Sequence, residues 1–61
     1  MKDLFIVTDL DKKQAKHAWN YGMRFKADSS LPITVSRKNV DNLRSKYKRI
    51  ILQYSTGTME V

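Results

Sequence analysis

The side chains that could do acid–base or nucleophilic chemistry are few, and they lie apart in this sequence. His17 is the only imidazole and the chain has no cysteine, so neither a disulfide nor a zinc site can be assembled. Asp9 and Asp11 are close together, but capping of a helix already explains them, and their i, i+2 spacing would keep the carboxylates apart on a helix. The serines have no base nearby, and no glycine-rich phosphate loop is present. We therefore expect a protein that is not an enzyme and that has no metal or cofactor site.

Basic side chains offer a different chemistry. Twelve Lys and Arg against six Asp and Glu give a net charge of +6, and six of the twelve cations lie within residues 36–49. Such an excess attracts polyanions and neutralises their phosphates. Asp41 interrupts this segment, so a solvated helix face is the alternative interpretation. The candidate binding residues here are Lys38, Arg44, Lys46, Lys48 and Arg49.

A second candidate patch is Arg24, Phe25 and Lys26. An aromatic ring between two cations can stack on a base while the cations hold its phosphates. However, the chain has few large apolar residues, and a core position is the favoured interpretation of Phe25.

The first half of the chain gives clear signals for a strand and a helix. The apolar residues 4–8 predict a strand that is central or buried on both faces. Asp11 is a good N-cap, with Gln14 three residues later, and Gly22 is a natural helix stop. We therefore expect a helix up to about Tyr21, with an extended or looped path for residues 12–21 as the alternative.

The second half predicts short strands around another helix. Residues 23–26 alternate as a half-exposed strand, and residues 31–35 are extended because Pro32 disfavours helix before it. From the N-cap Ser36, residues 36–49 predict an amphipathic helix whose apolar stripe is Val40, Leu43 and Tyr47. A strand at residues 50–54 and a flexible tail at residues 55–61 follow.

These elements follow the order β-α-β-α-β. They predict a single α+β domain over residues 1–54, with two helices on one face of a three-stranded sheet. We expect the stripe of the second helix to pack against Phe5, Val7, Ile51 or Trp19. A domain of this size buries only about 60% of its unfolded surface, so its stability is marginal. Association through an open sheet edge, giving a homodimer, would add burial.

The chain shows no sign of a membrane segment. Its longest apolar run near the N-terminus, residues 4–7, is too short for a signal-peptide core or a membrane span. We expect a cytoplasmic protein without a membrane partner.

The order of signals resembles the small N-terminal domains of Mu-like prophage proteins, the FluMu family. The elements that carry the resemblance are an opening strand, an aromatic-glycine-arginine stretch, a proline-containing strand and a closing helix-plus-strand unit: LFIVTD, WNYGMRF, LPITV and SRKNVDNLRSKYKRIILQ. The resemblance implies a phage or prophage origin, hence a bacterial host cell, and a small α+β module without established catalysis. It transfers no site residue.

The basic surface and the resemblance together favour a binding role. We expect a small non-enzymatic module that engages nucleic acid or an acidic surface of a host protein. The alternative is a structural or assembly protein that acts by self-association or by docking through a sheet edge.

Overall fold

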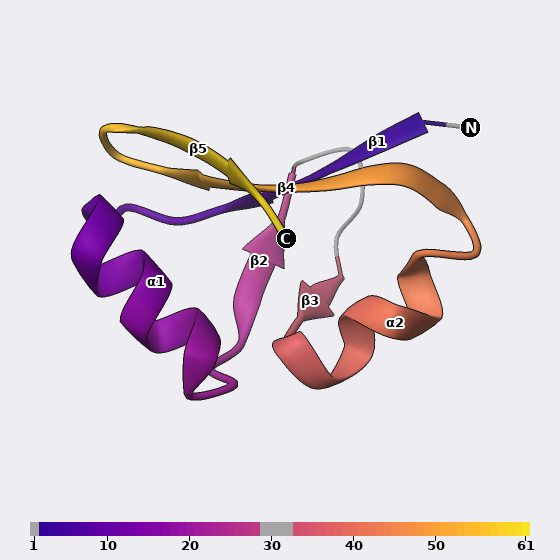
Figure 1. Cartoon of the computed structure of the whole chain (residues 1–61), viewed down its shortest axis with the longest axis horizontal. Coiled ribbons are helices and arrows are strands. Elements are labelled where there is room, and N and C mark those ends of the chain that lie inside the picture. The colour runs from indigo at the N-terminus through magenta and orange to yellow at the C-terminus, as the bar shows by residue number, and fades with distance from the viewer. Residues whose placement is uncertain (1, 29–32) are drawn as a thin grey trace.

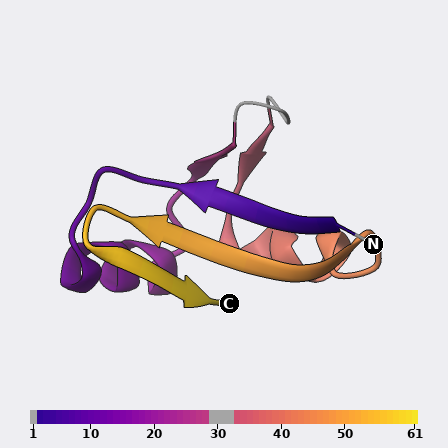
Figure 2. The ribbon, with the colours of Figure 1, turned by 90° about the horizontal axis from the view of Figure 1, so that it is seen from above.

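The computed structural model describes residues 2–28 and 33–61. Its strands form one mixed sheet in the order β3-β2-β1-β4-β5. Figures 1 and 2 show both α-helices against the same face of this sheet. In chain order the elements are β1 (Lys2–Val7), α1 (Lys12–Asn20), β2 (Phe25–Ala27), β3 (Thr34–Val35), a 3-10 helix η1 (Arg37–Asn39), α2 (Val40–Leu43), β4 (Tyr47–Tyr54) and β5 (Gly57–Glu60).

Strand β1 occupies the centre of the sheet, as its apolar sequence predicts. It pairs with β2 in antiparallel and with β4 in parallel orientation. Leu4 and Ile6 are fully buried toward the helices. Because side chains alternate along a strand, Phe5 and Val7 point to the opposite face, where Val7 is 40% exposed. β1 is therefore central but buried on one face only.

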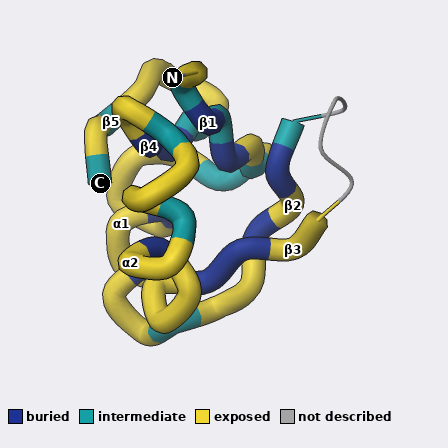
Figure 3. Tube along the Cα trace, turned by 90° about the vertical axis from the view of Figure 1, so that its right-hand side faces the viewer, coloured by how far each residue is buried: buried dark blue, intermediate teal, exposed yellow. Residues whose placement is uncertain are grey.

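The core lies between the sheet and the helices. Ala15, Ala18 and Trp19 of α1 belong to this core, and the ring centroids of Trp19 and Phe25 are 5.9 Å apart. Figure 3 shows that the buried stretches run mainly through the strands, whereas most of each helix is exposed. The outer surface of the helices is thus left free to carry charge.

The prediction of a first helix is confirmed. α1 begins after Asp11, whose Oδ1 accepts a hydrogen bond from the backbone N–H of Gln14 at 2.8 Å. It ends before Gly22, which has φ +74° and so takes the left-handed conformation that favours glycine. The alternative of an extended or looped path for residues 12–21 is wrong.

The prediction of a helix over residues 36–49 is wrong. Within residues 36–49, all of which the structure describes, only η1 and the single turn of α2 are helical, and β4 already begins at Tyr47. The register between β1 and β4 shifts by one residue beside Lys48, as in a β-bulge. Tyr47 is three residues before Ile50, so in a regular strand the two side chains would point to opposite faces. The register shift turns Tyr47 toward the core as well. The apolar residues of this bulged strand therefore have the spacing expected of a helix.

The prediction of three strands is also wrong, although the α+β class is confirmed. Within the described residues the sheet has five strands, because Thr34–Val35 form the edge strand β3 and residues 57–60, expected to lie in a flexible tail, form β5 on β4. Two residues connect Tyr54 to Gly57 in this hairpin, and the Tyr54 ring lies over Gly57, where an added Cβ would meet the ring at 3.3 Å. Leu31 and Pro32 lie outside the described residues.

The expected packing of the second apolar stripe is only partly correct. Val40 is buried, and Leu43 and Tyr47 pack at the edge of the core. The partners expected in the sheet were wrong, since Phe5, Val7 and Ile51 have the strand parity of the face turned away from the helices. Their neighbours Leu4, Ile6, Ile50 and Leu52 belong instead to the core cluster that contains Val40.

Within residues 2–28 and 33–61, no helix is both long and apolar enough to cross a membrane.

Candidate polyanion-binding surface

Charge is divided unequally between the two layers of the molecule. Residues 12–20 and 37–46, which comprise α1, η1, α2 and the following turn, hold seven of the twelve cations and one of the six carboxylates. The strands and the remaining loops hold five cations and five carboxylates. The whole net charge of +6 therefore belongs to the helical residues. We call their seven exposed cations the basic helical layer: Lys12, Lys13, Lys16, Arg37, Lys38, Arg44 and Lys46.

Three of these cations come from α1. Lys12 and Lys13 occupy its first turn, which contains no acidic residue. The positive end of the helix dipole disfavours cations there by a few tenths of a kcal/mol each, and the cap carboxylate of Asp11 offsets part of this cost. Lys16 is exposed on the next turn, four residues from Lys12 and on the same side of the helix. The lysines at these positions therefore do not stabilise α1. This favours a role for them in binding.

A groove of about 370 Å³ runs between α1 and α2. The Arg37 Nη1 atom donates a hydrogen bond to the backbone carbonyl of Asn20 at 3.5 Å, which ties η1 to the end of α1. Arg44 lines the same groove and forms an exposed ion pair of 3.4 Å with Asp41. An exposed pair of this kind contributes less than about 1 kcal/mol, so Arg44 can exchange Asp41 for a stronger anion. The groove thus offers two guanidinium groups to one anionic ligand.

The structure separates the residues that the basic segment brings together in sequence. Lys38, Arg44 and Lys46 lie in the basic helical layer, whereas Lys48 and Arg49 lie on β4. The five candidates of residues 36–49 therefore do not lie on one helix, because the chain changes to strand β4 at Tyr47.

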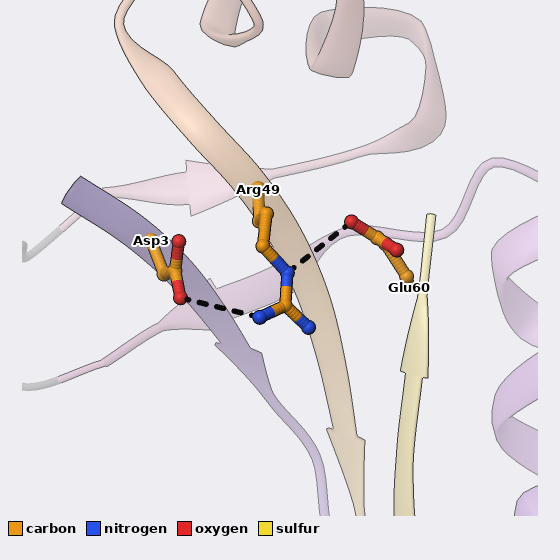
Figure 4. A network of polar contacts seen from close by, with 3 residues as sticks. All are labelled: Asp3, Arg49 and Glu60. Atoms are coloured by element: carbon orange, nitrogen blue, oxygen red, sulfur yellow. Dashed lines mark hydrogen bonds and ion pairs between the residues drawn. The ribbon is translucent and has the colours of Figure 1, made fainter. Parts of the chain in front are cut away.

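Arg49 forms two ion pairs within the sheet, and its side chain is 51% exposed. Its Nη1 lies 3.8 Å from Asp3 Oδ2 and its Nε lies 3.4 Å from Glu60 Oε1, which joins three strands as Figure 4 shows. Two carboxylates thus face one guanidinium, whereas Arg44 faces a single carboxylate. Arg49 therefore fits a role in sheet pairing better than one in binding a polyanion.

The second patch is divided in a similar way. Phe25 is buried against Trp19, so it is a core residue, as its sequence context favours, and offers no free ring face. Lys26 is exposed, and strand alternation turns it to the sheet face opposite the helices. Arg24 is exposed just before β2. These three residues cannot form one stacking site.

The polar residues considered for catalysis are also placed. His17 is exposed on α1, with its ring centroid 4.4 Å from that of Tyr21. Asp11 caps α1, and Asp9 shares with Lys26 and Asp28 a shallow groove of about 380 Å³ at the end of β1. Among the described residues, no group of three or more His, Asp or Glu side chains could hold a metal ion.

Sequence reasoning missed Lys12, Lys13, Lys16 and Arg37 as candidates. For the lysines a signal existed, since two cations in the first turn of a helix are locally unfavourable. Arg37 joins them only through its contact with Asn20, seventeen residues away, which no local pattern reveals.

Comparison of this chain with protein-family models, with curated proteins and with solved structures finds no match.

Proposed function

We propose that this protein is a non-enzymatic module that binds nucleic acid through the phosphates, using the basic helical layer. The single observation that carries the proposal is the concentration of the whole net charge in the residues of one layer. A prophage origin and a site of action in the cytoplasm of a bacterial host belong to the same proposal.

Two features favour nucleic acid over an acidic protein surface. Protein interfaces of mixed charge pair cations with carboxylates, whereas the basic helical layer has a single carboxylate, Asp41, among seven cations. Its cations also come from two adjacent helical segments with a groove between them, so several successive phosphates can be neutralised together. An acidic host protein is the competing partner, and the experiments below distinguish it from nucleic acid.

Three lysines of the layer provide the test. We expect the combined substitution of Lys12, Lys16 and Lys38 by Gln to leave the fold intact, because exposed changes usually lie within about ±0.5 kcal/mol each. Affinity for mixed-sequence DNA and RNA should fall, and the slope of log affinity against log salt should flatten by about 1 for each phosphate that the variant no longer neutralises. Fluorescence anisotropy at several salt concentrations measures both quantities.

The chain offers a control with the same change in charge. Substitution of Lys2, Lys26 and Lys48 by Gln removes three cations from the strands, and binding should stay close to that of the parent. Equal losses of affinity in the two triple variants would mean that only net charge matters and would refute the assignment to the helical layer. Capture of a protein from bacterial lysate that nuclease does not abolish, with no binding to DNA or RNA, would support the acidic-protein partner instead.

The outer edge of β5 favours a second candidate, self-association. The Val61 N–H donates to the Ile50 carbonyl at 2.9 Å, so strand alternation directs the backbone groups of Thr58 and Glu60 away from β4. The Tyr54 hydroxyl donates to the Thr58 carbonyl at 3.2 Å and protects part of this edge. The rest can pair with β5 of a second copy.

We expect sedimentation equilibrium at high protein concentration to detect a dimer if this second candidate is correct. Thr58→Pro, which removes an outward N–H, should then weaken the dimer more than it changes thermal stability. A strict monomer at all concentrations would rule out self-association and would leave the nucleic-acid proposal untouched.

A further inference from the structure

An apolar groove on the flank of α1 is not explained by phosphate binding. It has a volume of about 420 Å³ and is lined by Leu10, Lys13, Gln14, His17, Ala18 and Met23. Met23 is 57% exposed, so its side chain is open to contact with a ligand. The groove therefore has an apolar wall and one cation at its rim.

An exposed aromatic pair lies next to this groove. Tyr21 is 75% exposed, and its ring centroid is 4.4 Å from that of His17. His17 itself lines the groove. The two rings are tilted by 48°, so His17 supports one side of Tyr21 and most of the tyrosine remains open to solvent. A ring held in this way loses little conformational entropy when a planar ligand stacks on it.

The neighbouring charge indicates which planar ligand fits. Lys13, His17 and Tyr21 follow one another at intervals of four residues, so they are neighbours on one side of α1 and its C-terminal cap. Lys16 is exposed one residue before His17, within the basic helical layer. A ligand that combines a flat apolar ring with phosphates would contact the aromatic pair and the lysines at the same time.

We propose that this flank of α1 binds an unpaired base of single-stranded nucleic acid. The base stacks on Tyr21 and contacts Met23, while Lys13 and Lys16 hold its flanking phosphates. The proposal rests on the function proposed above and adds to it a preference for single strands. It also assigns to Tyr21 the stacking role that the sequence suggested for Phe25. Phe25 cannot take that role because it is buried in the core.

Three probes of equal length separate base contacts from phosphate contacts: a thymidine oligonucleotide, an abasic oligonucleotide and a mixed-sequence duplex. We expect the parent protein to bind the thymidine strand more tightly than the abasic strand. Tyr21→Ala should weaken thymidine-strand binding about tenfold, which is about 1.4 kcal/mol, because the variant loses the aromatic ring on which the base stacks. Met23→Ser should weaken it in the same direction, and neither variant should change binding of the abasic strand.

Val7→Thr is the matched control, because it alters an exposed apolar residue on the opposite face of the sheet and should leave all three affinities unchanged. Equal affinity of the parent for thymidine and abasic strands, or full binding by Tyr21→Ala, would overturn the stacking proposal while phosphate binding stands. Failure of all three probes to bind at low salt would overturn the proposed function as well.

Discussion

Leu52→Ala is expected to lower the free energy of unfolding by about 2–5 kcal/mol. Leu52 lies on β4, next to the central strand, is 0% exposed and contacts the core between sheet and helices. Truncation leaves a cavity that a small, densely connected core cannot fill. A domain of this size is stable by only about 3–9 kcal/mol, so a loss of this size removes a large share of its stability.

Chemical denaturation monitored by circular dichroism measures this decrease. Val7→Ala is the control, because Val7 lies on the face away from the helices and is already 40% exposed. Leu43→Ala, at a partly buried position, should fall between the two. If Leu52→Ala unfolds at the same denaturant concentration as the parent, the helices do not cover this face of the sheet.

Removal of residues 57–61 should be at least as damaging. Met59 and Val61 pack against the core, and β5 satisfies one edge of β4. Without this burial and this strand pairing, the free energy of unfolding should fall by about 3–5 kcal/mol. Thermal unfolding of the shortened chain provides the measurement.

Thr58→Ala tests whether any such destabilisation comes from the strand as a whole, because Thr58 is exposed and its side chain points to the open face of the sheet. This variant should melt within a few degrees of the parent. An unchanged melting temperature for the shortened chain would mean that these residues are the flexible tail that the sequence predicts, and that the sheet ends at β4.

The elements that could be predicted from sequence are those whose signals are local. The Asp11 cap, the Gly22 stop and the spacing of small apolar residues all lie within α1 or beside it, and no distant contact is needed to interpret them. The apolar run of β1 likewise requires burial wherever it is placed. These signals predict the α+β class and a central strand, but they do not determine how many strands the sheet has.

The errors occur where distant contacts decide the structure. The spacing of Val40, Leu43 and Tyr47 fits a helix, but pairing of Lys2 with Tyr47 and the register shift beside Lys48 make the last of these residues part of a strand. The two residues that connect β4 to β5 are Ser55 and Thr56. An Asn-Gly pair would have indicated a hairpin, but Ser-Thr is not a recognised signal for this type of turn. The packing of the Tyr54 ring over Gly57 becomes apparent only once the strands are paired.

The candidate site shows the same division. The density of positive charge in the sequence is enough to identify Lys38, Arg44 and Lys46 as binding candidates. Arg49 has the same charge, but its contacts with Asp3 and Glu60 place it outside the binding surface. The lysines of α1 join the surface only because the fold places both helices on one face of the sheet.

The most direct test of the central claim is a titration of the isotopically labelled protein with duplex DNA, followed through its backbone amide resonances. We predict that the shifts concentrate in residues 12–20 and 37–46 and that the open sheet face around Phe5, Lys26 and Arg49 is unaffected. Binding whose shifts fall on that open face, with the helical residues unchanged, would contradict the assignment of the basic helical layer.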